Sequence, residues 1–147
     1  MKIRFLGTLV AGTFLALMIA APAGAQMPGT ALRVNVPFQF IVSGKTLPAG
    51  NYEIRRINDS PEGLLIRNAT DKRDHVMFQT EPFAAIKIPR RSEIVFHRYG
   101  DDYFLYEVVT AGEQTERELL TSKAERRLMY EATRNVTKPE TVALATD

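Results

Sequence analysis

The first strong pattern along the chain is an alternation of apolar and polar positions over residues 34–43. The apolar positions of this pattern are Val34, Val36, Phe38, Phe40 and Val42. A period of two places these side chains on one face of a β-strand. Pro37 has no N–H to donate to a neighbouring strand, so we expect this strand at a sheet edge or at a bulge.

Further strand patterns follow at short intervals, separated by clusters of turn-forming residues. They predict strands over 51–57, 64–67, 75–80, 92–99 and 102–110. Segment 81–91 contains two prolines and is predicted to be a connection with room for a short strand. Because no helix separates the early strands, the pattern favours a mainly all-β fold over a parallel α/β fold. We expect an antiparallel sandwich or barrel of about six to eight strands.

The period changes near the end of the chain, where it predicts one helix. Apolar residues recur at every fourth position, at Leu120, Ala124, Leu128 and Ala132. Ser122 followed three residues later by Glu125 matches a capping box, so we expect a helix over about 122–134. After the helix, a short strand near Val142 and a disordered tail remain alternatives.

The hairpin over 92–110 predicts two sheet faces that are both largely apolar. With Gly100-Asp101 as its two-residue turn, Val95 pairs with Tyr106 and Ile94 with Glu107. One face then carries Ile94, Phe96, Tyr103 and Leu105, and the other carries Val95, His97, Tyr99, Phe104, Tyr106 and Val108. We expect the helix to cover the second face. The alternative is an aromatic surface, formed by His97, Tyr99, Phe104 and Tyr106, that binds a sugar, lipid or protein partner.

The first 25 residues have the pattern of a cleavable secretion signal. Lys2 and Arg4 precede an apolar run over 5–21, and Ala23-Gly24-Ala25 supplies the small residues that a signal peptidase requires. We expect cleavage after residue 25, a flexible lead over 26–31 and a single domain over 32–147. An uncleaved anchor is the alternative, although the run is at the short end of the roughly 17–25 residues that span a bilayer.

Charge and cysteine content exclude several classes of protein. Two of the 19 basic residues and none of the 17 acidic residues lie in the predicted signal, so the remainder has no net charge. A neutral domain has no general attraction for nucleic acid or for an anionic membrane. The chain has no cysteine, which removes disulfides, thiolate metal sites and a lipoprotein anchor. No later stretch is long enough to span a membrane.

One tight basic cluster, formed by Lys87, Arg90 and Arg91, stands beside Pro89. A solvated loop is the ordinary interpretation of such a cluster. Contact with an acidic polysaccharide or a phosphate head group is the alternative.

The search for catalytic and metal-binding motifs favours no enzyme class. His75 and His97 are the only histidines, and they fall on different predicted strands without the spacing of a metal site. No serine lies in a Gly-x-Ser-x-Gly turn, and no glycine-rich phosphate loop occurs. We therefore expect no catalytic residue, no metal and no cofactor.

The leading hypothesis is a non-enzymatic exported domain, periplasmic or extracellular, with a binding or structural role. An envelope protein or a polysaccharide would be its partner. A first alternative is a barrel-type carrier of a small apolar ligand. A second is a small hydrolase acting on envelope polymers, in which His75 or His97 would meet a carboxylate.

Three blocks of sequence carry a resemblance to a known family. They are residues 36–40 (VPFQF), residues 47–52 (LPAGNY) and residues 96–105 (FHRYGDDYFL), and residues 117–119 (REL) with 122–123 (SK) also fit the pattern. Together they resemble a family of small, uncharacterised exported proteins that are numerous in soil bacteria such as acidobacteria. The resemblance spans most of the chain after the predicted signal. It implies an exported β domain and carries no activity, cofactor or binding residue with it.

Overall fold

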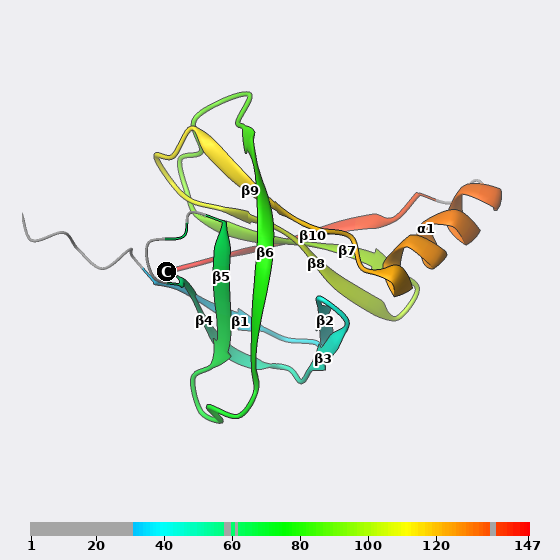
Figure 1. Cartoon of the computed structure of the whole chain (residues 1–147), viewed down its shortest axis with the longest axis horizontal. Helices are drawn as coiled ribbons and strands as arrows, with labels where there is room; N and C mark the ends of the chain where they lie inside the picture. The colour runs from blue at the N-terminus through cyan, green and yellow to red at the C-terminus, as the bar shows by residue number, and fades with distance from the viewer. Residues whose placement is uncertain (1–30, 58–59, 61, 136–137) are drawn as a thin grey trace, which may run out of the picture.

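The computed structural model describes residues 31–57, 60, 62–135 and 138–147 (Figure 1). The predicted signal over 1–25, and all of the predicted lead except Ala31, lie outside the described residues. The strands are β1 (Leu32–Val36), β2 (Phe40–Val42), β3 (Lys45–Leu47), β4 (Gly50–Arg56), β5 (Gly63–Asn68), β6 (His75–Ala84), β7 (Glu93–Tyr99), β8 (Asp102–Val109), β9 (Thr115–Leu119) and β10 (Glu140–Ala145). One helix, α1 (Lys123–Arg134), lies between β9 and β10. The protein is therefore all-β with one C-terminal helix, as the sequence predicts.

The strands form one mixed sheet that does not close into a barrel. Its main path runs β1-β4-β5-β6-β9-β8-β2-β3, and β7 pairs with the other side of β8 and with β10. All pairs are antiparallel except β2 with β8, which meet in a parallel bridge between Ile41 and Phe104. The long strand β6 pairs with β5 through its first part and with β9 through its second, and so joins the two halves of the sheet (Figure 1).

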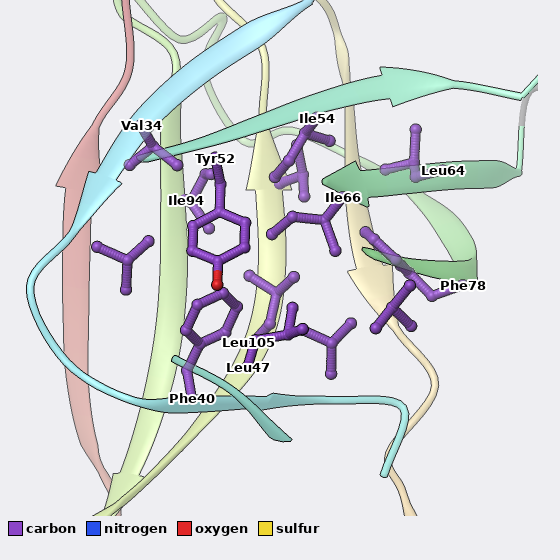
Figure 2. Packing of buried hydrophobic residues seen from close by; sticks show 14 of the residues in the cluster. Val34, Phe40, Leu47, Tyr52, Ile54, Leu64, Ile66, Phe78, Ile94 and Leu105 are labelled. Atoms are coloured by element: carbon purple, nitrogen blue, oxygen red, sulfur yellow. The ribbon is translucent and has the colours of Figure 1, made fainter. Parts of the chain in front are cut away.

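The core lies between these two halves of the sheet. The apolar positions of the opening alternation point into it, with Val34, Val36, Phe40 and Val42 at most 5% exposed. Figure 2 shows the rings of Phe40 and Tyr52 in contact at the centre, where their centroids are 5.0 Å apart. Burial of such side chains is the main force that holds a cysteine-free domain together.

The opening segment forms two strands where the pattern predicts one. β1 ends at Val36 and pairs with β4, whereas β2 begins at Phe40 and pairs with β3 and β8. Pro37 stands at the break, where it has no ladder hydrogen bond to donate. The chain therefore crosses from one half of the sheet to the other while its apolar side chains keep facing the core.

The β7–β8 hairpin has the predicted turn, and its register is as predicted for four residue pairs. Beyond the pair of Phe96 with Leu105 a β-bulge shifts the register, so that Val95 pairs with Glu107 and Ile94 with Val108. The predicted face is therefore wrong for the two β8 residues beyond the bulge, Glu107 and Val108, whereas Ile94 keeps its predicted place in the core. Val108, expected on the outer face, is 2% exposed in the core, and Glu107 moves outward. The bulge thus keeps a carboxylate out of the apolar interior, where its desolvation would be costly.

The division of the opening strand and three further strands, β3, β9 and β10, raise the number to ten, above the expected six to eight. β3 occupies part of a predicted turn, β6 continues to Ala84 through an edge that includes Pro82, and β9 was not foreseen. β10 confirms the alternative of a short strand near Val142, and it pairs with β7. No helix in the described part of the chain is long and apolar enough to cross a membrane.

Candidate functional site

The first turn of α1 is held against the sheet by a buried carboxylate. The Ser122 hydroxyl accepts a hydrogen bond of 3.1 Å from the Glu125 N–H, as the capping box predicts. The Glu125 side chain is only 7% exposed, and its Oε1 lies 3.4 Å from Nδ1 of His97 on β7. This contact fixes the start of the helix over the outer face of the β7–β8 hairpin.

The four aromatic candidates do lie together on this outer face. The His97 ring stacks on Tyr106 with centroids 3.8 Å apart, and Tyr99 meets Phe104 edge to face at 5.9 Å. Phe104 is only 3% exposed, so it supports the other rings from below and does not meet a partner directly. Burial raises the pKa of Tyr106 to about 12, and the Glu118, Glu107 and Glu125 carboxylates act in the same direction.

The helix covers this face less completely than the sequence predicts. Leu120, the first residue of the predicted stripe, is 54% exposed, and Ala124 is exposed as well. The side of α1 turned toward the sheet carries Glu125, Leu128 and Ala132, which are spaced three and four residues apart. The rest of the helix extends beyond the sheet (Figure 1). A cleft therefore opens between the helix and the hairpin.

This opening, the α1–β7 cleft, consists of two adjoining recesses of about 340 and 510 Å³. His97 and Tyr99 form its floor, α1 supplies one wall, and the segment before β10 supplies the other. The remaining lining residues are Leu128, Met129, Glu131, Ala132, Thr133 and Asn135 on the side of α1, Lys138, Pro139 and Glu140 on the opposite side, and Arg98 and Gly100 beside the floor. Apolar walls around a few polar groups are typical of small-ligand sites.

The polar groups at the floor of the cleft lack partners within the described residues. The Tyr99 hydroxyl is buried and makes no hydrogen bond there. Burial, and then the Glu125 carboxylate, raise the pKa of Tyr99, so the hydroxyl stays protonated and can donate. Nδ1 of His97 is buried too, and its contact with Glu125 is not an aligned hydrogen bond. Leaving a buried donor without an acceptor costs free energy. A bound ligand that supplied the acceptor would remove this cost.

A second cluster, of carboxylates, lies farther along the same sheet and was not expected from the sequence. Glu107 on β8 stands directly opposite Glu118 on β9. Burial, and then the nearby Glu116 and Glu118 carboxylates, raise the pKa of Glu107 to about 7. The hairpin bulge and the β8–β9 pairing bring these groups together, and no local motif indicates either feature. Within the described residues, no three His, Asp or Glu side chains are arranged to hold a metal ion.

The remaining candidates lie away from the cleft. Lys87, Arg90 and Arg91 belong to the β6–β7 loop, which projects beyond β9, whereas α1 extends from another side of the molecule (Figure 1). His75 is exposed at the start of β6, where its Nδ1 lies 3.0 Å from the Lys72 carbonyl oxygen. Of the two histidines, His97 is the one that meets a carboxylate.

Fold and site together define an all-β domain with a cleft between its helix and the β7–β8 hairpin. No protein-family model matches the chain, no curated protein is significantly similar to it, and no solved structure matches it. The resemblance to small exported proteins therefore stays a prediction, and function must be argued from the site itself.

Proposed function

We propose that the chain is an exported binding domain and that the α1–β7 cleft is its ligand site. The pattern of residues 1–25 supports export. The observation that carries the binding role is Tyr99, which lines both recesses and whose protonated hydroxyl is buried beneath them without a partner among the described residues.

The cleft favours an apolar ligand that presents a hydrogen-bond acceptor. Met129, Ala132 and Pro139 offer apolar contacts, and the buried Tyr99 hydroxyl would donate to the ligand once the ring turns toward the recess. Lys138 adds a positive charge to the smaller recess, which no carboxylate among the described residues lines, so a ligand carboxylate suits this recess better than a neutral carbonyl. The larger recess is also lined by Glu131 and by Glu140, which pairs with Arg98 at 3.2 Å. A ligand cation would find no such complement among the described residues of the smaller recess.

The carrier alternative has less support than a surface cleft. Phe40, Tyr52 and Phe96 are at most 1% exposed and belong to the core cluster. Figure 2 shows Phe40 and Tyr52 in the space between the two halves of the sheet. A small apolar cargo inside the sheet would have to displace these rings, whereas the cleft is already open.

The hydrolase alternative keeps one specific observation, the contact of 3.4 Å between His97 and Glu125. Glu125 would orient the imidazole, whose Nε2 would then take a proton from water. Hydrolysis of p-nitrophenyl butyrate by the wild type would support this role if His97→Gln abolishes it. The control His75→Gln, which changes the exposed histidine, should leave the activity unchanged. A wild-type protein without measurable hydrolysis would contradict the hydrolase alternative.

The binding proposal is tested by NMR titration with two matched probes, hexanoate and hexylamine. We expect hexanoate to shift the amide signals of Tyr99, Ala132 and Thr133, and hexylamine to leave them in place. Tyr99→Phe should weaken hexanoate binding about tenfold, because a hydrogen bond to a charged group is lost. Tyr130→Phe is the matched control, since Tyr130 is 66% exposed on α1 and does not line the cleft.

Two results would contradict the binding proposal: hexanoate shifts that appear elsewhere on the domain, or wild-type affinity in Tyr99→Phe.

The export proposal is tested by fractionating a Gram-negative host that expresses the full chain. We expect the protein outside the cytoplasm with Gln26 as its first residue. Ala25→Leu should block this processing, because the peptidase needs a small residue at that position. A full-length product that stays in the cytoplasm would show that residues 1–25 are not a secretion signal.

A further inference from the structure

The β6–β7 loop, residues 85–92, displays large apolar side chains to solvent. Ile86 is 99% exposed and Ile88 is 55% exposed, and Phe83 at the end of β6 is 38% exposed. Single exposed apolar residues are common on protein surfaces, but two isoleucines at one loop tip form a patch that calls for an explanation.

The backbone of this loop is anchored at both ends. The Ala85 N–H donates to the Gln114 carbonyl, and the Gly112 N–H donates to the Pro89 carbonyl, each at 2.9 Å. Both partners belong to the turn between β8 and β9. The isoleucines are thus presented on a backbone that the neighbouring turn holds in place, and their exposure follows from the fold.

The same loop carries a concentration of positive charge. Lys87, Arg90 and Arg91 are all exposed, and no acidic residue occurs between positions 82 and 92. Arg91 is 77% exposed and meets Glu93 only at 3.7 Å. The nearest acid on the anchoring turn, Glu113, pairs with Arg56 at 2.8 Å. The charge of the loop is therefore left for a partner outside the domain.

We propose that the β6–β7 loop docks the domain on an anionic lipid bilayer. Ile86 and Ile88 would enter the boundary between head groups and acyl chains, while Lys87, Arg90 and Arg91 contact lipid phosphates. An apolar tip ringed by cations is the combination that interfacial membrane binding requires. A soluble acidic polysaccharide would use the cations and leave Ile86 in water, which does not account for the apolar tip.

The position of the loop suits this role. It projects beyond β9, away from α1, so the α1–β7 cleft stays open when the loop meets a membrane (Figure 1). Glu116 on β9 stands opposite Phe83 at the end of β6, so an anionic surface that came closer than the loop tip would meet a carboxylate. Contact is thereby limited to the tip. This docking does not depend on what the cleft binds.

The test is co-sedimentation of the full chain with vesicles of phosphatidylcholine alone or with 30% phosphatidylglycerol. We expect binding to the anionic vesicles only, weakened at high salt. The double variant Ile86→Ser, Ile88→Ser should lose at least tenfold in affinity, and each of Lys87→Gln, Arg90→Gln and Arg91→Gln about fivefold. The predicted signal is common to all variants, so differences in their vesicle affinity measure the contribution of the loop.

Two control variants distinguish binding through this loop from nonspecific adsorption to vesicles. Met77→Ser removes a 65% exposed apolar side chain on β6, and Lys72→Gln removes an exposed cation. Both should bind vesicles as the wild type does. The chain has no tryptophan, so Ile86→Trp provides a single tryptophan, and its emission should shift to shorter wavelength on anionic vesicles.

Three outcomes would overturn the proposal. One is equal binding to neutral and anionic vesicles, and another is unchanged binding in the isoleucine double variant. The third is Ile86→Trp emission that vesicles leave unchanged, with binding instead to dextran sulfate through the cations alone. That last result would assign the loop to an acidic polysaccharide.

Discussion

Among single residues, Glu107 couples the fold to pH. Its pKa is raised from 4.5 to about 7, first by burial and then by Glu116 and Glu118. Between these two values the folded protein holds a proton that the unfolded chain has released. The free energy of unfolding therefore falls as the pH rises from about 4.5 to 7, because the unfolded state binds fewer protons there.

We predict that the Tm of the wild type decreases between pH 5 and pH 8 and that Glu107→Gln flattens this decrease. The difference should be on the order of 1–2 kcal/mol, since one pKa unit corresponds to about 1.4 kcal/mol and solvent screens part of the effect. Calorimetry at several pH values measures it. Glu62→Gln, at an exposed position, is the control. A slope that Glu107→Gln leaves intact would assign the pH response to other groups.

Tyr52 provides a test of hydrogen bonding in the core. Its hydroxyl donates to the Pro48 carbonyl at 2.7 Å, and the residue is 1% exposed. Tyr52→Phe leaves that carbonyl without its donor and should lower the free energy of unfolding by about 1 kcal/mol. Urea denaturation measures the change, with Tyr130→Phe as a control that should have no effect. Equal stability of the two variants would mean that water replaces the lost bond.

At the scale of elements, features that depend on neighbouring residues could be predicted from the sequence, whereas features that depend on the pairing of distant strands could not. The bounds of α1 and the turn of the β7–β8 hairpin follow from caps and turn residues that lie within a few positions of each other. The bulge beside Phe96 and the break at Pro37 depend on strands that meet from distant parts of the sequence. Periodicity predicts which side chains face inward, but it does not predict which strand lies next to which.

The same distinction applies to the candidate site. His97 and Tyr99 were candidates because the hairpin register is local, whereas Lys138 and Pro139 join them only through the path of the chain after α1. The Glu125 contact with His97 also lacked a sequence signal, since the capping box accounts for Glu125 without reference to the sheet.

The helix cap gives the prediction at this scale. Ser122→Ala removes the acceptor of the Glu125 N–H and should cost about 1 kcal/mol, whereas Ser122→Asp should retain most of the stability. Lys123→Ala, at an exposed position next to the cap, should change little. Thermal unfolding followed by circular dichroism compares the three. Equal losses in Ser122→Ala and Ser122→Asp would show that the cap does not depend on the acceptor.

For the whole molecule, β6 is the strand that makes the two halves of the sheet unfold together. It pairs with β5 on one side of the core and with β9 on the other (Figure 1). Phe78 on β6 is 4% exposed within the core (Figure 2). Its side chain therefore supports both halves.

Phe78→Ala should lower the free energy of unfolding by about 3–5 kcal/mol, because it removes a buried ring and leaves a cavity. Native-state hydrogen exchange should then accelerate to a similar extent in β4 and in β7, as expected for one cooperative unit. Acceleration in β4 alone would show that the halves unfold separately.

The claim that an acceptor-bearing apolar ligand occupies the α1–β7 cleft is tested most directly by methyl NMR. The Met129 methyl group lies at the cleft, and that of Met77 is exposed on β6 (65% exposed). With the protein labelled at its methionine methyl groups and saturated with hexanoate, the account predicts intermolecular NOEs from the hexanoate chain to Met129 and none to Met77. NOEs to Met77, or none to Met129 at saturation, would contradict it.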